Sequence, residues 1–421
     1  MMLLKKYMNS EFTPLYIIIG VLLIVFVGFE FQLYGDFSIY FAASQDLAKG
    51  INVYTYNYGT NQDLPYMASP ALAYLLYPFS LLSLPVAAAI WKMANILLLY
   101  RLWILLEKHF SSVNWKGKQH RTWILLSILS LSFILYRNFH LSQFTVLLLY
   151  LIFEGIYQIR KSKYLLLGPF LLGLGITVKI LPIVALPYLL FRGYWKQVLL
   201  SILFLALTLF LPALTLGFDF ALVLNRAWIT SISPTSDMNV FDVSQNVVHG
   251  IATLISTLTI DGIGNDYSLS LKRNIIDVNP SIVVGIIMAA KGLLLLSILY
   301  VLRLKTFFKD IGINIQSFYE LSYILLISPL VFPQSRIYNF LFLLPAMSYF
   351  SYLIIKHREG LSMSVKVLLA LSVLILNLEL ILGNFREYYW HFKSLTYATL
   401  VLLVLLLWLK PEKFQLSNKD E

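Results

Sequence analysis

Long apolar stretches separated by short polar connections run along almost the whole chain. The first extends from Pro14 to about Phe31, too long for the apolar core of a cleaved signal peptide. About 20 apolar residues span a bilayer as a helix, whereas a shorter run such as 180–191 indicates a broken or re-entrant helix. The pattern predicts an all-α polytopic membrane protein with about 11–13 transmembrane helices in a single integral membrane domain over residues 1–421. The further apolar segments lie at about 86–106, 121–136, 142–159, 164–178, 180–191, 197–216, 281–302, 318–332, 337–355, 367–382 and 394–409.

Two more polar stretches interrupt this pattern, at residues 34–68 and 217–280, and we expect each to form a long outer loop. Between Asp36 and Gly50 the apolar positions recur with helical spacing, which predicts a short amphipathic helix lying flat on the outer leaflet. The next stretch, 69–85, is apolar but broken by three prolines, so we expect it to lie beside the membrane or to re-enter it.

The composition supports a membrane protein. Of the 421 residues, 59% are hydrophobic and 13% are charged, and the mean hydropathy is +0.76, values that a soluble domain rarely reaches. Cysteine is absent from the sequence, which excludes disulfides and thiolate metal sites. The net charge of +11 would suggest nucleic-acid binding in a soluble protein.

The distribution of the basic residues explains this charge in another way. If the first segment begins in the cytoplasm, with Lys5 and Lys6, most of the 32 lysines and arginines fall in cytoplasmic connections, as the positive-inside rule requires. This predicts a multi-pass protein of the plasma (inner) membrane, surrounded by membrane lipids, with both termini in the cytoplasm. The basic excess then needs no nucleic acid as a partner.

Asp36 is the first candidate for chemistry. It stands in Gly35-Asp36-Phe37, at the outer end of the first apolar segment, and opens the expected amphipathic helix. Transfer of a sugar from a phosphate-linked donor needs a base that takes the proton of the acceptor hydroxyl, and a carboxylate suits that task. Aspartate is also a favoured residue for capping the start of a helix. The two roles are compatible, and the sequence leaves both open.

Cations are the second requirement, because a departing polyprenyl phosphate develops negative charge. Lys179 lies between two apolar segments, and Arg336 lies in a very tight connection between two others. Arg137 shares another short outer turn with His140 and Gln143, whose side chains we expect to contact the donor or the acceptor. Each cation alone is equally well explained as an anchor for lipid headgroups. Convergence of the three would instead indicate a phosphate site.

Aromatic and histidine residues add weaker indications. Tyr40 is one of six tyrosines in the first loop and is expected to contact the donor or the acceptor, although interfacial tyrosines more often mark the headgroup level. The histidines are too scattered for a metal-ligand spacing, and no glycine-rich phosphate loop or Ser/His/Asp arrangement is present. The sequence therefore predicts no metal and no cofactor.

At these residues the chain resembles glycosyltransferase family 87, a family of membrane mannosyltransferases that use polyprenyl-phosphate mannose. The similar pieces occur in the order and spacing of the family and extend over most of the length. They are Gly35-Asp36-Phe37 with Tyr40, Ala42-Ala43, Gly50 and Val53-Tyr54; Ser69-Pro70, Leu76, Pro78, Trp91 and Asn95; His140-x-x-Gln143, Tyr157, Gly168, Gly173, Lys179 and Pro182; and Ser328-Pro329 with Leu344-Pro345. The resemblance implies that Asp36 is the catalytic base and that Lys179 and Gln143 belong to the donor site.

Two motifs differ from the family pattern. Gln245-Asn246-Val247 stands where the family has Asn-Gln-Ser, and Gln334-Ser335 precedes Arg336 where paired histidines are common. We expect Gln245 and Asn246 to contact the donor or the acceptor. Either difference would alter the choice of donor or acceptor, or indicate that the chain belongs to a sibling family.

Together these features predict an inverting, metal-independent glycosyltransferase. It would move a hexose, expected to be mannose, from a polyprenyl-phosphate donor to a hydroxyl of a glycolipid or polysaccharide acceptor at the outer membrane face. Asp36 would take the proton of that hydroxyl, while Lys179 with Arg137 or Arg336 would hold the phosphate.

Two other interpretations stay open at this point. A transporter or lipid flippase would place charged residues at mid-span beside an aqueous path, and Lys92, Glu154, Lys291 and Glu379 lie in or near spans. A structural assembly subunit with a degenerate enzyme fold would explain the two motif differences.

Overall fold

The computed structural model describes residues 13–59, 64–161, 164–243, 246–262, 269 and 271–415. Three residues named above, Lys5, Lys6 and Gln245, lie outside this part of the chain. The described chain is helical almost throughout, and its one small sheet pairs two strands of two residues each. The predicted all-α fold is confirmed.

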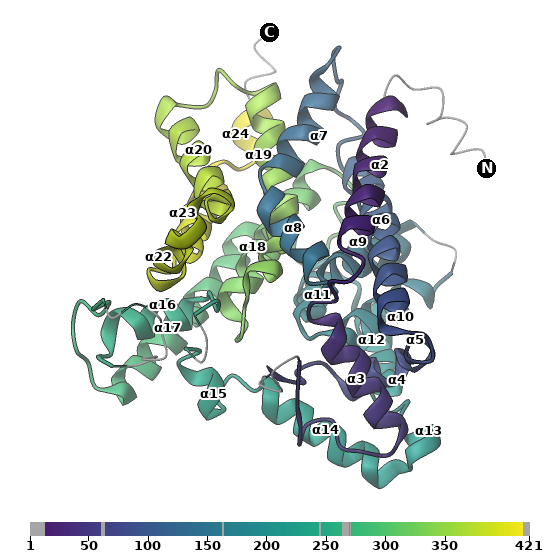
Figure 1. The fold of residues 1–421 in the computed structure, drawn as a ribbon. Coiled ribbons are helices and arrows are strands. Elements are labelled where there is room, and N and C mark those ends of the chain that lie inside the picture. The colour runs from purple at the N-terminus through teal and green to yellow at the C-terminus, as the bar shows by residue number, and fades with distance from the viewer. Residues whose placement is uncertain are drawn as a thin grey trace.

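The amino-terminal half of the chain forms most of one helical bundle (Figure 1). Proline in the first turn, where the missing N–H would have no helical partner, starts four of its helices, α4, α5, α6 and η1. The strands β1 and β2 pair antiparallel, with Asn57 opposite Pro65. The elements are α2 (Thr13–Phe29), α3 (Phe37–Ala48), β1 (Asn57–Tyr58), β2 (Leu64–Pro65), α4 (Pro70–Leu75), α5 (Tyr77–Ser80), α6 (Leu84–Lys108), α7 (Gln119–Leu129), α8 (Ser132–His140), α9 (Thr145–Lys161), α10 (Leu167–Val178), η1 (Leu181–Val184), α11 (Ala185–Phe191), α12 (Trp195–Leu209) and α13 (Ala213–Leu216).

The carboxy-terminal half continues with a second set of helices. Its longest helix, α17, starts at Pro280, and the side chain of Asn279 caps it by accepting a hydrogen bond from Ser281 N at 2.9 Å. The elements are α14 (Phe218–Ile232), α15 (Asp237–Val240), α16 (Ile251–Thr259), α17 (Pro280–Leu302), η2 (Leu304–Thr306), α18 (Ile315–Val331), η3 (Ile337–Leu343), α19 (Leu344–Lys356), α20 (Met363–Asn377), α21 (Glu379–Leu382), η4 (Gly383–Phe385), α22 (Arg386–His391), α23 (Ser394–Trp408) and α24 (Glu412–Gln415).

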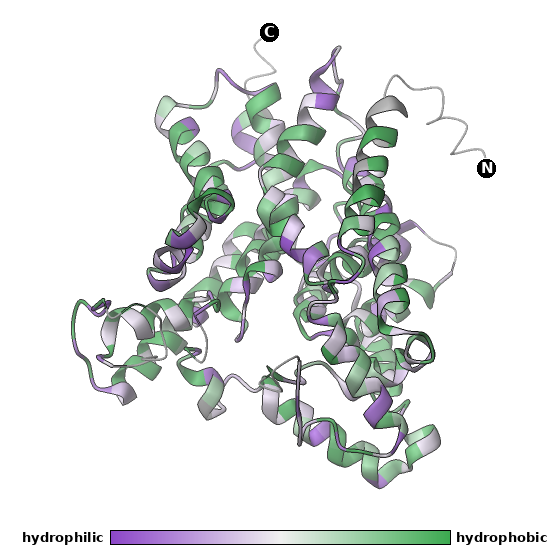
Figure 2. Cartoon of the chain, in the orientation of Figure 1, coloured by the Kyte–Doolittle hydropathy of each residue, from purple (hydrophilic) through white to green (hydrophobic). Residues whose placement is uncertain are grey.

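Apolar residues cover the long helices, and hydrophilic ones gather mainly at helix ends and connections (Figure 2). By length and composition, four helices of the described chain can cross a membrane, or up to six if each of two bent helix pairs is one span. The bends are 59° between α7 and α8 and 53° after α20. The polytopic class is confirmed. The predicted count of about 11–13 spans exceeds the number of helices long enough to cross, because several apolar segments form short or bent helices.

Close backbone packing organises the first bundle. Helix α10 packs against both α9 and α12. A Cβ added at Gly168 would lie 2.7 Å from Gly155 O, and one added at Gly173 would lie 2.8 Å from Ser201 O. Small residues at such positions let apolar helices approach closely enough for dense van der Waals contact. In the second half, α18 has the same central role, because it is buried along almost its whole length against α17, α19 and α23.

The two ends of the molecule differ. The start of α2 and helix α24 lie at one end, whereas α3, α4, α5 and α14 lie at the opposite end (Figure 1). We call the latter the α14 end. The segment 217–280, predicted to be a loop, contains the helices α14, α15 and α16, and α14 crosses this end of the molecule (Figure 1).

The helix predicted between Asp36 and Gly50 is present as α3. The prediction that Asp36 caps this helix with its side chain is wrong: Asp36 occupies the N-cap position, but its carboxylate makes no capping hydrogen bond. Its backbone angles, φ −67° and ψ −14°, are already helical rather than the extended values typical of a capping residue. The carboxylate is therefore available for other contacts. That α3 lies flat on the outer leaflet stays a prediction.

Two contacts fix the chain that leads into α3. Gly35 has φ +50°, and a Cβ added there would lie 2.7 Å from Leu141 O, so only glycine fits this approach to the α8–α9 connection. Before it, the Lys92 ammonium, 1% exposed, donates to the carbonyl oxygens of Glu30 and Leu33 at 2.8 Å each. These bonds hold the end of α2 against α6.

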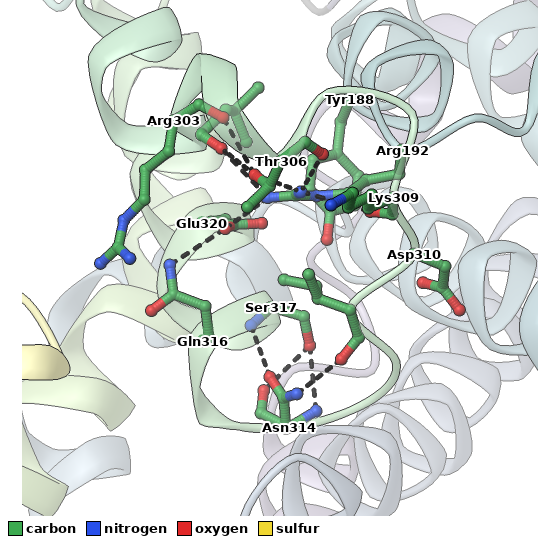
Figure 3. Close-up of polar contacts among 12 residues, drawn as sticks. Tyr188, Arg192, Arg303, Thr306, Lys309, Asp310, Asn314, Gln316, Ser317 and Glu320 are labelled. Atoms are coloured by element: carbon green, nitrogen blue, oxygen red, sulfur yellow. Dashed lines mark hydrogen bonds and ion pairs between the residues drawn. The ribbon is translucent and has the colours of Figure 1, made fainter. Parts of the chain in front are cut away.

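A buried ion pair joins α11 to α18. Arg192 Nη2 lies 2.5 Å from Glu320 Oε1, and the two side chains are 0% and 1% exposed. Arg192 also donates to the carbonyl and hydroxyl oxygens of Thr306, at 3.2 and 3.0 Å, and Gln316 donates to Glu320 at 3.0 Å (Figure 3). A buried charge is tolerated only when partners of this kind surround it.

A separate set of hydrogen bonds begins α18. Asn314 and Ser317 form a reciprocal capping box, with side-chain to backbone bonds of 2.9 and 3.0 Å (Figure 3). Helix α11 follows Lys179 in the chain and ends at Phe191, next to Arg192, whereas α18 holds Glu320 near its start and ends shortly before Arg336. Lys179 and Arg192 thus lie at opposite ends of one segment, and Arg336 and Glu320 lie at opposite ends of another. The Arg192–Glu320 pair joins these two segments at the ends away from Lys179 and Arg336.

Removing one member of this pair should destabilise the fold. Replacing Arg192 by leucine leaves the Glu320 carboxylate buried without its partner, and we expect a loss of about 3–5 kcal/mol in the free energy of unfolding, measured by SDS titration. The double variant Arg192→Leu/Glu320→Leu should recover part of that loss. Lys49→Leu, which breaks an exposed pair with Asp46, is the control and should change stability by less than about 1 kcal/mol. Equal midpoints for all variants would contradict the role of the pair.

The Gly35 contact gives a second prediction. Gly35→Ala adds a Cβ against Leu141 and strains a positive φ, whereas Gly50→Ala strains a φ of +76° with no atom within 4 Å. Gly50→Ala is therefore the control: it should lose only the cost of placing alanine at a positive φ, about 1–2 kcal/mol in unfolding free energy. Gly35→Ala should lose clearly more. The difference between the SDS-titration midpoints of the two variants measures the cost of the clash with Leu141. Equal losses of stability would show that the approach to Leu141 is not tight.

Candidate active site

A cavity at the α14 end brings together residues from distant parts of the chain. It encloses about 960 Å³, counting the part open to the outside. Its walls come from α3, β2 and α4, from the break between α10 and η1, from α14 and α15, and from the connection between α18 and η3. Most of the lining is apolar, and its charged residues are Asp36, Lys179 and Arg336.

Asp36 is held by groups on both sides of the α8–α9 turn. Its backbone N donates to Leu141 O at 3.1 Å. The Gln143 amide nitrogen donates to its Oδ2 at 2.5 Å, and Gln143 itself is 2% exposed. A hydrogen bond also links Asp36 to the Tyr338 hydroxyl. The carboxylate is thus oriented by two neutral donors, Gln143 and Tyr338, which leave it able to accept a proton.

Gln143 is itself fixed by aromatic packing. The Trp91 indole donates to Ser142 O at 3.0 Å, and the Trp91 ring lies 4.4 Å from the Phe144 ring between centroids. Ser142 adopts φ +50°, a conformation that L residues rarely take and that these neighbours maintain. The turn that presents Gln143 is therefore rigid.

Lys179 lies in the break between α10 and η1, where the backbone is extended at φ −157° and ψ 141°. Its ammonium donates to Asn339 Oδ1 at 3.1 Å and lies 5.0 Å from the centre of the Tyr338 ring. Burial lowers the pKa of Lys179 to about 8, an effect that the Asp36 charge opposes and the Arg336 charge reinforces. The hydrogen-bond partner of Lys179 is a neutral amide, so its positive charge remains available to an anion.

Arg336 follows the short turn after α18 and also lines the cavity. Its backbone pairs with Val248 in an antiparallel bridge. Its charge acts on Lys179 and on Tyr338. The cavity thus carries two cations and one carboxylate, a balance that favours an anionic ligand.

Tyr40 is the first-loop tyrosine that lines the cavity. Its ring packs edge-on to Phe144, with centroids 4.9 Å apart, and burial raises the pKa of its hydroxyl well above the usual value. Two other tyrosines of the first loop have structural roles. The Tyr54 hydroxyl donates to Ala68 O at 2.6 Å, and the Tyr66 hydroxyl donates to Ser69 O at 2.7 Å.

Four of the described residues predicted for the site do not line the cavity. Gln143 is one of them and reaches the site only through its bond to Asp36. His140 Nδ1 lies 2.9 Å from a carboxylate oxygen of Glu30, next to the buried Lys92. Arg137 lies on the same helix as His140, α8. Its charge acts on Tyr338, but it is not part of the cavity wall. Asn246 contributes its backbone oxygen to another contact, described below. Gln245 lies outside the described residues.

The sequence interpretation missed several residues of the site. Tyr338 and Asn339 contact Asp36 and Lys179, although only Arg336, two residues earlier, had been selected. Trp228 and Asn239 line the cavity from the segment predicted as the second loop. A polar pair inside an otherwise apolar run, as in Tyr338-Asn339, is the signal that could have drawn attention to them.

Among the described residues, no three histidine, aspartate or glutamate side chains are grouped as a metal site would require. The cavity instead offers a carboxylate, two cations, a buried amide and aromatic hydroxyls. This set can accept a proton and can bind an anion that carries an apolar group.

Comparison with known proteins gives one match. A model of glycosyltransferase family 87 matches residues 66–310, whereas no curated protein and no solved structure matches the chain. The matched region is more than half of the chain and contains Gln143 and Lys179, and the fold adds Asp36 and Arg336 from outside it. This chain therefore belongs to glycosyltransferase family 87.

Proposed function

We propose that this membrane glycosyltransferase moves a hexose, mannose by the family resemblance, from a polyprenyl-phosphate donor to a hydroxyl of a glycolipid or polysaccharide acceptor. The observation that carries the proposal is the cavity in which Asp36 lies with Lys179 and Arg336 among mostly apolar walls. A sugar phosphate attached to a prenyl chain combines the anionic and apolar parts that such a cavity accommodates.

The proposed reaction is a single displacement. The acceptor oxygen attacks the anomeric carbon and forms the new bond while the bond from that carbon to the phosphate oxygen breaks, which inverts the anomeric configuration. Asp36 takes the proton of the acceptor hydroxyl. The electron pair leaves with the polyprenyl phosphate, whose added negative charge is stabilised by Lys179 and Arg336. These side chains are enough for a monophosphate, so the proposal needs no metal.

Apolar side chains near the two cations can contact the prenyl chain of the donor. Val178, Ile180 and Leu181 flank Lys179 in the wall, and Phe332 comes just before the turn to Arg336. Burial of prenyl carbons against such side chains would contribute about 25 cal/mol per Å² of apolar surface removed from water. The same arrangement would place the phosphate beside the two cations.

The proposed orientation puts the cavity at the outer face of the plasma membrane. The start of α2 and helix α24 lie at the end of the molecule opposite the α14 end (Figure 1). With the amino- and carboxy-terminal ends assigned to the cytoplasm by the positive-inside rule, the cavity faces outward. A lipid-linked donor and an envelope acceptor would meet there.

The contacts of the four mid-span charges favour an enzyme over a transporter or flippase. Lys92 is bonded at the end of α2, as described above, and Arg101 makes a two-pronged contact with Glu154 at 2.8 and 3.0 Å. Glu379 accepts a hydrogen bond from the Trp390 indole at 3.0 Å, and Lys291 lies within electrostatic reach of Asp242. None of the four lines the cavity. Each has a local partner, as structural charges do.

Asp36→Asn tests the proposed base. Because the amide cannot take the proton, transfer from a polyprenyl-phosphate sugar to an acceptor lipid should fall by at least about 10²–10⁴-fold in kcat, while the protein still folds. Asp46→Asn, on the same helix but outside the cavity wall, should retain activity. Purified protein in detergent with a radiolabelled donor gives the measurement. Full turnover by Asp36→Asn would exclude Asp36 as the base.

Lys179 gives a prediction of pH dependence. With the Lys179 pKa lowered to about 8, the cation predominates below that pH, so kcat/KM for the donor should be level below pH 8 and fall above it. Lys179→Arg should remove this alkaline limb because arginine stays protonated. Lys179→Met should lower kcat/KM at pH 7 by roughly 10- to 150-fold, since a hydrogen bond to a charged group contributes about 1.5–3 kcal/mol. An unchanged profile in Lys179→Arg would assign the limb to another group.

A further inference from the structure

The turn that carries Arg336 into the cavity is bonded to Asp242, Val248 and His249. The backbone N of Gln334 donates to Asp242 Oδ1 at 2.9 Å, and His249 N donates to Ser335 O at 2.7 Å. Between these bonds, Val248 pairs with Arg336 itself. Three successive residues of the turn are therefore tied to a segment about 90 residues earlier in the chain.

The turn needs this support. Gln334 adopts φ +54°, in the region that favours glycine, and Ser335 is fully buried. Asp242, at the other side of the contact, is also at a positive φ, +55°, and is 1% exposed. Two residues strained in this way persist only where neighbouring contacts determine their conformation.

Lys393 contacts the segment that pairs with this turn. It lies between α22 and α23, is fully buried, and donates from its ammonium to the backbone oxygens of Asn246 and Val248 at 2.8 and 3.0 Å. The charge of Arg273 repels that ammonium, and the charge of Asp242 attracts it. A buried ammonium is costly unless several acceptors surround it, so Lys393 is stable only with this segment in place. The carbonyl of Val248 and the backbone of Arg336 thus connect Lys393 to the cavity.

We propose that Lys393 is a positioning residue for sugar transfer: by holding the segment 246–249 it fixes the Pro333–Arg336 turn and so keeps the Arg336 guanidinium where the donor phosphate binds. The catalytic part of this inference rests on the proposed function. The structural part, that Lys393 keeps the turn in place, does not depend on it.

A double-mutant cycle on the intact protein tests the catalytic part. If Lys393 acts through Arg336, Lys393→Met and Arg336→Met should each lower kcat/KM for a polyprenyl-phosphate sugar by a similar factor, roughly 10-fold or more. The double variant should be no slower than Arg336→Met alone. The loss should be in KM for the donor more than in KM for the acceptor, and Lys393→Arg should restore part of it. Effects that multiply in the double variant would overturn the proposal.

Hydrogen exchange measured by mass spectrometry tests the structural part without any substrate. In Lys393→Met, peptides that contain Gln334 and His249, whose amides donate across the contact, should exchange at least 10-fold faster. Peptides from α19, buried elsewhere, should exchange as in wild type, which excludes general unfolding. Unchanged exchange at Gln334 and His249 would overturn the proposal.

A second variant decides the matter if Lys393→Met does not fold. Asp242→Asn keeps an oxygen for the Gln334 amide but removes the charge that acts on Lys393, so the same peptides should exchange faster than wild type. If wild type protein transfers no sugar but the exchange results hold, the proposed function fails and the positioning of the turn stands. If wild type transfers sugar and exchange is unchanged, only the role of Lys393 fails.

Discussion

The approach of Gly35 to the backbone of Leu141 is the constraint on which the site depends. A residue with a Cβ does not fit there, and the glycine also permits the positive φ of the turn. The contact brings the start of α3 against the α8–α9 connection, so that Gln143 can reach Asp36. The Asp36 carboxylate accepts a hydrogen bond from the Gln143 amide and makes no capping bond to its own helix. One backbone contact thus decides whether Asp36 is a helix cap or a group in the cavity.

The partners of the charged residues separate structural roles from the proposed chemical ones. Arg192 is neutralised by Glu320 in the apolar interior, as a buried charge requires. At the cavity, by contrast, Lys179 has a neutral hydrogen-bond partner, Asn339, and Asp36 has a neutral one in Gln143. A site that leaves opposite charges incompletely compensated is prepared for a ligand that carries charge and delivers a proton.

Much of the fold and part of the site could be predicted from the sequence. Charged residues are rare in so apolar a chain, which directed attention to Asp36, Lys179 and Arg336, and all three line one cavity. His140 was selected for the same reason, as a polar residue in an apolar chain. It lies instead against Glu30, 110 residues away, a contact that no local pattern reveals. Tyr338 was missed because tyrosine in an apolar run is ordinary unless its neighbours in space are known.

That the chain is a helical membrane protein could be concluded from the sequence alone, because the length of the apolar segments and the scarcity of charge depend only on composition and order. The sequence also selected a small set of candidate residues. Which of them meet is visible only in the folded chain, since the bonds of Gln143 to Asp36 and of Lys179 to Asn339 join residues 107 and 160 positions apart. The fold also places Lys393 against Val248, which pairs with Arg336. Such contacts arise from the packing of whole helices, which the local pattern of apolar and polar residues does not specify.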